Sequence, residues 1–244
     1  MDIKIFFKSS LANLSKKQQI LSLLVLNSGF NGLLLLFRLI RTEALFNMPG
    51  WHSSEMNHSP WFFMFLAWNL FLAWIPFLIA YHLERIRNAF QVKMVIWAFL
   101  LVWLLFLPNA PYLVTDLVHL KYRPPLPLWY DMILLFSFAW TGLLLGFFSL
   151  VFAGEFWAKY IHPRTDGLFV FCSLLLCSFG IYIGRFQRWN SWDILTDPAN
   201  LIRDIFDIFL NPVHNLRVLG ITAIFFCLLS LGYLLFKTLI KHHE

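Results

Sequence analysis

The sequence predicts an all-α, polytopic integral membrane protein, a helix bundle with about six transmembrane helices. Of its 244 residues, 59% are apolar and only 13% are charged, and the mean hydropathy is +0.68. Soluble domains carry about a quarter charged residues, so this chain lacks the polar side chains needed to cover a globule in water. The apolar residues also fall in runs near the ~20 residues that cross a bilayer core. A single transmembrane domain over residues 1–244 is therefore predicted.

Apolar run length places the spans. The predicted spans cover residues 20–40, 61–81, 94–114, 129–152, 167–183 and 219–239. Residues 1–19 form a basic N-terminal surface segment, in which residues 3–19 have the pattern of a short amphipathic helix. The first apolar run lacks a clear small-residue cleavage site, which favours an uncleaved first helix over a removed signal peptide.

The third span contains a double-proline break, Pro108-Asn109-Ala110-Pro111. The apolar run 94–107 would be about 21 Å long as a helix, too short to cross a bilayer core of about 30 Å. Because proline disrupts the helical hydrogen bonds, we expect the third helix to break between Pro108 and Pro111 and to restart with Asn109 as its cap. Irregular backbone at this depth is tolerated where it is buried in protein or lines a wet cavity. A simple proline kink with a packing role is the alternative.

Two further features concern packing and the membrane surface. Gly142 and Gly146 have the spacing that lets helices approach closely, in the same chain or in a second copy, so the oligomeric state stays open.

Residues 184–218 form the longest loop, which is predicted to be extracytoplasmic. Within it, the pattern near residues 199–210 indicates an amphipathic helix lying in the membrane interface.

Basic residues indicate the orientation. Of the 19 lysines and arginines, 11 fall on the side of the N-terminus and 8 on the opposite side. The positive-inside rule then predicts that both termini are cytoplasmic. These residues flank apolar runs and do not gather in one patch, so the lipid bilayer is the expected partner and nucleic acid is not.

Alternation of the spans gathers polar residues at one face. The third span ends, the fourth begins and the fifth ends on the same side, which the orientation makes extracytoplasmic. The candidate ligand-binding residues there are Asn109, Tyr112, Asp131, Arg185, Arg188, Asn190 and Asp193. Unpaired charges in low dielectric are costly, so we expect at least one acid–arginine contact between residues 106–131 and 184–193.

The residue types at this face suggest several kinds of chemistry. Arg185 and Arg188 are spaced to lie on one helix face and to grip a phosphate or carboxylate, although membrane anchoring and charge pairing explain them equally well. Asp116 and His119 are the candidates for proton transfer. With Asp131 and Asp193 they offer oxygen and nitrogen ligands, but no recognised metal motif is present, so no metal is predicted and no cofactor is assigned. Asp131 also suits the first turn of a helix, and His119 an ordinary interfacial position.

Two strings carry a family resemblance, FLPNAPYLVTDLVHL at residues 106–120 and GRFQRWNSWD at residues 184–193. With the pair Tyr130-Asp131, they resemble a family of bacterial integral membrane proteins known as a domain of unknown function. Its members carry PNAPY-x-VTDL-x-HL and RWNSWD motifs. The resemblance covers about residues 100–230. It implies a small multispanning protein of a bacterial inner or plasma membrane, and it implies no activity.

Three functions stay open. The first is binding or transport of a small anionic or lipid-headgroup ligand at the extracytoplasmic face. The second is an enzyme acting on a lipid-linked or phosphorylated substrate, and the third is a structural or assembly role. Asn27, Asn31 and Asn69 are polar residues within the spans, but no acid accompanies them near the middle of a span, which argues against a proton-coupled carrier.

Overall fold

The computed structural model describes residues 15–42, 62–210 and 216–241, and within these residues the regular structure is entirely helical. Six stretches are long and apolar enough to cross a membrane, namely Lys16–Arg41, Met64–Phe90, Lys93–His119, Leu128–Tyr160, Asp166–Gln187 and Leu216–Ile240. They match the six predicted spans in order. The predicted class, a polytopic membrane helix bundle, is therefore confirmed.

The elements in chain order are α2 (Lys16–Arg41), α3 (Met64–Phe90), α4 (Lys93–Phe106), α5 (Asn109–Tyr112), the 3-10 helix η2 (Leu113–His119), α6 (Leu128–Tyr160), α7 (Asp166–Tyr182), the π-helical turn η3 (Ile183–Gln187), α8 (Asp193–Thr196), α9 (Pro198–Leu210) and α10 (Leu216–Lys241).

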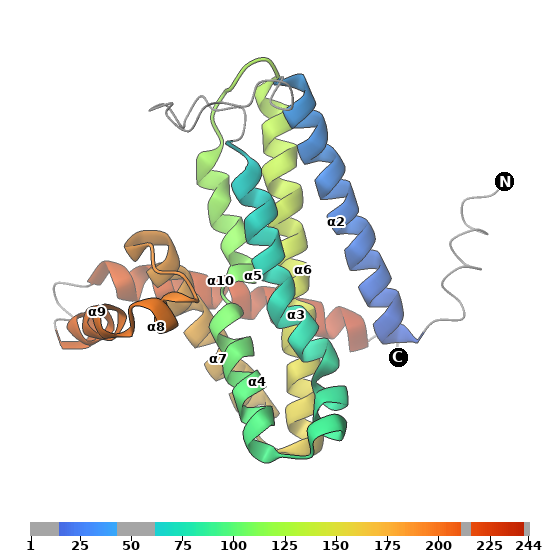
Figure 1. Cartoon of the computed structure of the whole chain (residues 1–244), viewed down its shortest axis with the longest axis vertical. Coiled ribbons are helices and arrows are strands. Elements are labelled where there is room, and N and C mark those ends of the chain that lie inside the picture. Colours follow the sequence, from blue (N-terminus) through green and yellow to red (C-terminus); the bar gives the residue numbers. More distant parts are fainter. Residues whose placement is uncertain (1–14, 43–61, 211–215, 242–244) are drawn as a thin grey trace.

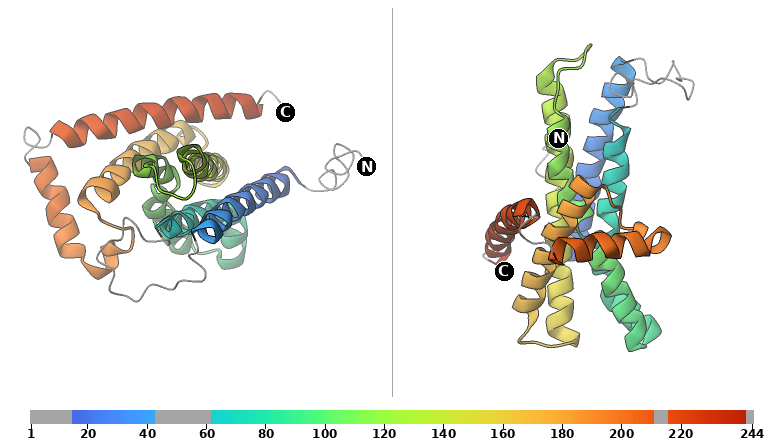
Figure 2. Two further views of the ribbon diagram at one scale, coloured as in Figure 1. Left: turned by 90° about the horizontal axis from the view of Figure 1, so that it is seen from above. Right: turned by 90° about the vertical axis from the view of Figure 1, so that its left-hand side faces the viewer.

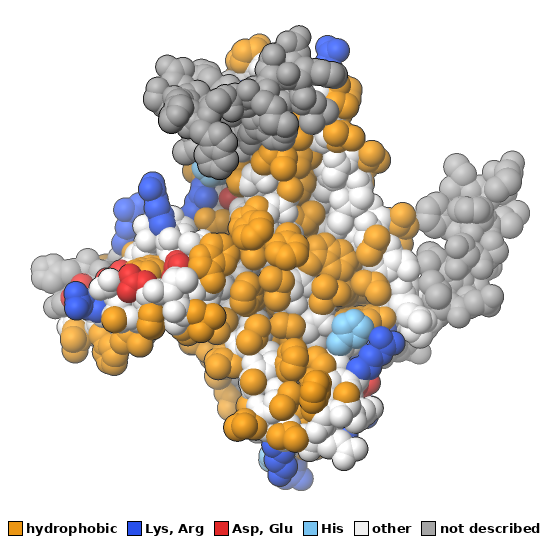
Figure 3. All heavy atoms as spheres, viewed as in Figure 1, with side chains coloured by type: hydrophobic (Ala, Val, Ile, Leu, Met, Phe, Trp, Pro, Cys, Tyr) orange, Lys and Arg blue, Asp and Glu red, His pale blue; other side chains and the backbone are white. Residues whose placement is uncertain are grey.

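The long helices do not all share one direction. In Figure 1, α2, α3, α6 and the stretch from α4 to η2 run along the long axis of the molecule, with α7 beside them. In Figure 2, α9 and α10 lie across this axis on the outside of the bundle. Hydrophobic side chains cover much of the surface over α3 and α4 in Figure 3, as expected for helices that contact lipid tails.

The start of α2 is set by a capping box. The Ser15 hydroxyl accepts from the backbone N–H of Gln18 at 3.3 Å, and the Gln18 side chain accepts from the Ser15 N–H at 2.9 Å. Residues 15–19 thus form the cap and first turn of α2. The rest of the predicted N-terminal surface segment, residues 1–14, lies outside the described residues.

The predicted break in the third span is present as an interruption of the helix. α4 ends at Phe106, and the chain resumes as α5 and then tightens into η2. Leu107 and Pro108 keep helical backbone angles, with φ −53° and ψ −40° for Leu107 and φ −59° and ψ −28° for Pro108. The backbone therefore keeps its helical course through the break, and only the pattern of helical hydrogen bonds is interrupted.

Glycines make room for this segment. The carbonyl oxygen of Ala110 lies where a Cβ on Gly142 of α6 would be, and a Cβ on Gly180 of α7 would come within 2.5 Å of Pro108 Cγ. At Gly146 the corresponding distance to Ala110 Cβ is 3.4 Å. The close packing predicted for Gly142 and Gly146 thus occurs within this chain, between α6 and α5.

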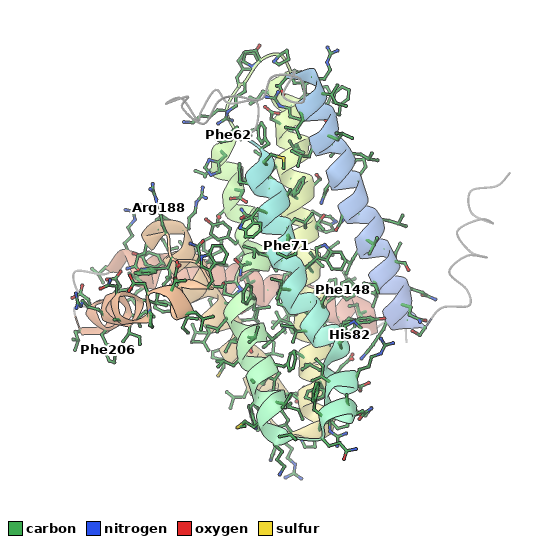
Figure 4. All side chains as sticks on the ribbon, in the orientation of Figure 1. Phe62, Phe71, His82, Phe148, Arg188 and Phe206 are labelled. Atoms are coloured by element: carbon green, nitrogen blue, oxygen red, sulfur yellow. The ribbon has the colours of Figure 1, made fainter. Side chains whose placement is uncertain are left out.

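The predicted amphipathic helix is confirmed as α9. Its residues Leu201, Ile205 and Ile208 pack with Tyr182 at the end of α7 and Ile183 at the start of η3. Phe206 stays exposed on the outer side of α9, as Figure 4 shows. The placement of α9 in a membrane interface stays a prediction, as do the single domain over residues 1–244 and the extracytoplasmic side of residues 184–218.

Candidate functional site

An ion pair joins the two motif-bearing segments. Arg185 of η3 approaches Asp116 of η2, with Nη1 at 3.5 Å from Oδ1. Asn69 of α3 donates from Nδ2 to the other carboxylate oxygen at 2.9 Å. Asp116 is 1% exposed, so its carboxylate is partnered by an amide and a guanidinium inside the protein. The expected acid–arginine contact between residues 106–131 and 184–193 is thereby confirmed.

Arg185 also binds the aromatic residues around this carboxylate. Its Nη1 donates to the Tyr112 hydroxyl at 3.4 Å, and its Nη2 lies 3.1 Å from His119 Nε2. The imidazole of His119 packs edge-on against the rings of Phe62 and Phe65, with centroids at 5.8 and 5.1 Å. One guanidinium therefore fixes three side chains of the α5–η2 stretch.

Asp131 belongs to a different ion pair. Arg38 of α2 grips it in a bidentate manner, with Nε at 2.7 Å from Oδ1 and Nη2 at 3.3 Å from Oδ2. The Arg38 and Asp131 side chains are 3% and 0% exposed. Arg38 Nη2 also donates to the backbone carbonyl of Arg123 at 2.9 Å. The side chain of Arg123 is partly buried, and this burial lowers the pKa of its guanidinium. Asp131 is thus held by α2 and not by Arg185.

Sequence reasoning missed Arg38 as a partner. It stands near the end of an apolar run, where a basic residue usually anchors a helix at the membrane surface. The sequence did contain one indication of this pairing, the position of Arg38 at the end of the first span. The end of the first span and the start of the fourth emerge on the same face, which brings Arg38 and Asp131 together.

Asn109 connects the proline break to the second motif. Its Nδ2 donates to the carbonyl of Phe106 at 3.0 Å and to Ser191 Oγ at 2.9 Å, and Ser191 donates to the carbonyl of Leu105 at 2.9 Å. The prediction that Asn109 caps the restarted helix is wrong, because its amide is a donor to the end of α4. Pro108 holds the cap position of α5 without a side-chain hydrogen bond.

Arg188 does not share a helix face with Arg185, contrary to the prediction. Its backbone is left-handed, with φ 62° and ψ 27°, and it ends η3. The side chain is exposed and extends away from the bundle in Figure 4. The wider turn of η3 and this left-handed residue direct the two arginines apart.

The remaining motif residues stabilise their own loop. Asp193 accepts from the backbone N–H of Asn190 at 2.6 Å and from its side-chain amide at 3.2 Å. The Trp189 indole donates to Asp204 of α9 at 2.9 Å, which ties this loop to α9. Asp193 therefore orders residues 190–196 and does not reach Asp116.

A groove of about 250 Å³ lies beside the Asp116–Arg185 pair. Its polar lining comes from three predicted residues, Asn109, Tyr112 and Asn190, and from Asn69 and Ser191. The rest of the lining is Trp68, Leu72, Leu105, Pro108, Gly180, Ile183, Gly184, Trp189, Ile194, Leu201 and Ile205. No charged side chain of the described residues lines the groove. Asn69 was read from the sequence only as a polar residue within a span.

The candidate metal ligands are dispersed. Asp116 pairs with Arg185, Asp131 with Arg38, and Asp193 with Asn190. His119 is bound to Arg185. Over residues 15–42, 62–210 and 216–241, no three histidine, cysteine or acidic side chains are grouped as a metal site would require. The donor set around Asp116 consists of amide and guanidinium groups, which suits a carboxylate and not a cation.

Comparison with known proteins identifies the family. The model of the family described as "Protein of unknown function (DUF1361)" matches residues 68–231, which is more than half of the chain. No curated protein and no solved structure matches the chain. The match includes both motif-bearing segments, the groove and both buried carboxylates. The chain is a multi-pass membrane protein, and it belongs to the family of proteins of unknown function DUF1361.

Proposed function

We propose that this protein binds the headgroup of a membrane lipid in the groove beside the Asp116–Arg185 pair. The observation that carries the proposal is the lining, in which amide and hydroxyl groups face apolar and indole side chains in a space of about 250 Å³. Binding sites for whole small molecules occupy about 300–1,000 Å³, so this groove suits a headgroup whose acyl chains stay in the bilayer.

The hydrogen bonds within the lining define what a ligand would meet. The Tyr112 hydroxyl accepts from Arg185, so its own hydrogen is left to donate to a ligand. The Asn109 amide nitrogen donates to two protein oxygens, which leaves its carbonyl oxygen as an acceptor. Asn190 likewise donates to Asp193 and keeps its side-chain oxygen. Donors and acceptors together fit a headgroup with hydroxyl groups better than a bare anion, which would require donors alone.

Arg188 supplies the charge for an anionic headgroup. It follows η3 directly, is exposed, and contacts no carboxylate of the described residues. Trp189 and Asn190, the next two residues, line the groove. A phosphate bound by Arg188 would therefore lie at the rim, with the hydroxyl groups of the same headgroup inside. Of the two ligand classes that the sequence predicts, the lipid headgroup is the better supported.

Asp116, Arg185 and His119 act in this proposal as positioning residues. None of them lines the groove, but Asp116 orients Asn69 and Arg185 orients Tyr112. Proton transfer by Asp116 would require a substrate to reach oxygens that already bind Asn69 and Arg185, and His119 Nε2 already lies against Arg185. The enzymatic and the purely structural alternatives therefore receive less support than headgroup binding.

The proposed setting is the plasma membrane of a bacterium, with both termini cytoplasmic and the groove on the extracytoplasmic side. The excess of basic residues on the side of the N-terminus supports this orientation. The groove would then take its lipid from the outer leaflet. The orientation and the ligand have separate tests, so one can fail without the other.

Headgroup binding is tested with the purified full-length protein and two lipids, phosphatidylglycerol and phosphatidylcholine. Native mass spectrometry of the protein with each lipid measures affinity. We expect tighter binding of phosphatidylglycerol, which carries glycerol hydroxyls and a net negative charge. Tyr112→Phe should weaken it about tenfold, because a hydrogen bond to a charged or strongly polar partner is lost.

The matched control is Tyr122→Phe, which removes the same hydroxyl from an exposed tyrosine outside the groove. It should leave phosphatidylglycerol affinity unchanged. Equal binding of the two lipids, or equal effects of the two tyrosine variants, would contradict the proposal. Displacement of the lipid by glycerol 3-phosphate at low millimolar concentration would indicate that the headgroup alone is recognised.

A further inference from the structure

A second cleft lies apart from the groove, at the end of the bundle where α3 meets α4. It has a volume of about 740 Å³ and forms where α3 ends, α4 begins and α6 ends. Its polar lining consists of Arg87, Asn88, Gln91 and Lys93. In Figure 1 these helix ends lie at the bottom of the molecule, and Figure 3 shows Lys and Arg side chains exposed there.

The charges of this cleft are all of one sign. Arg87 and Lys93 are basic, and among the described residues no carboxylate lines the cleft. Glu84, one turn before Arg87, is engaged by Lys159 at 3.1 Å. Within the described part of the chain, neither Arg87 nor Lys93 forms an ion pair. Two cations without a counter-charge in one cleft indicate an anionic ligand.

Arg87 is held in place by its surroundings. Its guanidinium stacks over the ring of Tyr160 at 4.1 Å from the centroid, and its Nη1 lies 3.4 Å from Asn88 Oδ1. Stacking fixes the plane of the guanidinium and leaves its edge able to donate to a phosphate. A residue that served only as a membrane anchor would not require this fixed geometry.

The backbone between α3 and α4 turns sharply at Gln91. This residue is left-handed, with φ 49° and ψ 9°, and its N–H donates to the carbonyl of Arg87 at 3.0 Å. Glycine and asparagine are the usual residues at such a helix end. The turn brings Arg87, Gln91 and Lys93 around one cleft, and the glutamine adds an amide donor where a glycine would add none.

The other walls of the cleft are apolar and aromatic. Ile96 and Trp97 of α4 face Phe156 and Tyr160 of α6. Trp97 is 52% exposed, so this side opens toward the surface that lipid tails would cover. A polar, basic end beside an apolar wall matches the two ends of a phospholipid.

We infer that this cleft is a phosphate-binding site, formed by Arg87 and Lys93 with the amides of Asn88 and Gln91, and occupied by an anionic phospholipid or by free phosphate. The shared chemistry is a phosphate group bound by a guanidinium and an ammonium. Basic clefts between transmembrane helices on the cytoplasmic side commonly take anionic headgroups. The inference is independent of the proposed groove, with which the cleft shares no residue.

Binding is tested on the purified full-length protein with two probes, phosphatidic acid by native mass spectrometry and inorganic phosphate by calorimetry. Arg87→Gln and Lys93→Gln are compared with Arg85→Gln. Arg85 is exposed on the same helix and does not line the cleft, so its variant loses the same charge near the same surface. We expect each cleft variant to weaken binding about fivefold, as for one basic residue near an anionic surface, and Arg85→Gln to change it less.

The two probes distinguish the sources of the phosphate. Binding of phosphatidic acid that depends on Arg87 and Lys93, without such binding of inorganic phosphate, assigns the site to a lipid. The reverse assigns it to free phosphate. Lys93 is exposed, so Lys93→Gln keeps the test valid if Arg87→Gln fails to fold. Equal losses in all three variants, or binding unchanged in Lys93→Gln and Arg87→Gln, would overturn the inference.

Discussion

At the scale of single residues, the two buried carboxylates have different partners and different surroundings. Asp131 is gripped by two nitrogens of Arg38, and both side chains are almost fully excluded from solvent. Asp116 is bound by one amide nitrogen and by a partly exposed arginine that has two further partners. The first pair therefore joins α2 to α6, while the second organises the wall of the groove.

The Arg38–Asp131 pair gives a prediction about stability. Arg38→Ala or Asp131→Ala should each lower the free energy of unfolding by about 3–5 kcal/mol, because an uncompensated charge stays buried. The double replacement Arg38→Met with Asp131→Leu should cost less than either single change, since it leaves no unpaired charge. Unfolding in mixed micelles with increasing dodecyl sulfate measures these values.

The exposed pair Lys159–Glu84 is the matched control. Its side chains are 61% and 40% exposed, and its Nζ–Oε1 distance is 3.1 Å. Lys159→Ala should cost less than about 1 kcal/mol, because solvent screens this pair. If the control and Arg38→Ala had the same effect, the buried pair would not hold α2 against α6.

At the scale of elements, the α5 segment depends on the two helices behind it. Ala110 lies against Gly142 and Gly146 of α6, and Pro108 lies against Gly180 of α7. A proline at membrane depth leaves helical backbone groups without their usual partners. Close contact with glycine-bearing helices keeps these groups within protein and away from lipid.

Gly142→Ala should lower the free energy of unfolding by about 1–3 kcal/mol, because the new methyl group overlaps the Ala110 carbonyl. Gly29→Ala is the matched control, since nothing lies within 4 Å of a Cβ at Gly29 in the middle of α2. That change should be neutral or stabilise the protein by up to about 1 kcal/mol, because alanine favours helix. The same unfolding titration compares the two. A Gly142→Ala protein as stable as the wild type would show that α5 moves freely against α6.

Element boundaries also show where reasoning from sequence succeeds. Apolar run length placed the spans, because crossing a bilayer fixes a minimum length for each helix. The pattern of α9 was predicted because its polar and apolar residues alternate with the helical period. The role of Asn109 was mispredicted. An asparagine can cap the end of the preceding helix or the start of the following one. Only the tertiary contact with Ser191 decides that Asn109 binds the end of α4.

At the scale of the whole molecule, orientation is the property that the proposals share. Reporter fusions at Lys121 and at Lys159 should fall on opposite sides of the membrane, with Lys121 outside. Lys121 precedes α6 and Lys159 lies in its last turn, and α6 is 33 residues long and therefore able to cross the bilayer alone. Activity of a periplasmic reporter at Lys121 and of a cytoplasmic reporter at Lys159 checks this. Both positions on one side would remove the argument for a shared polar face.

The crosswise course of α10 was beyond reach of the sequence. Its composition satisfies the requirement for a span, and composition says nothing about direction.

The residues of the groove were only partly predictable for a related reason. Alternation brings segments to one face, which identified Asn109, Tyr112 and Asn190. It does not say which side chains within a face touch, so Asn69 was read only as a polar residue within a span and not as part of the groove.

The contact between the Ala110 carbonyl and Gly142 joins main chain to main chain, and no side-chain rotation can loosen it. Asn109 and Tyr112 flank Ala110 and line the groove. Their positions are thus preorganised by the backbone before any ligand arrives. Ligand binding in the groove would therefore cost the protein little conformational entropy. Most of the favourable energy of the ligand's contacts would then contribute to the binding free energy. Recognition here would resemble rigid docking, with selectivity set by the shape and polarity of the headgroup.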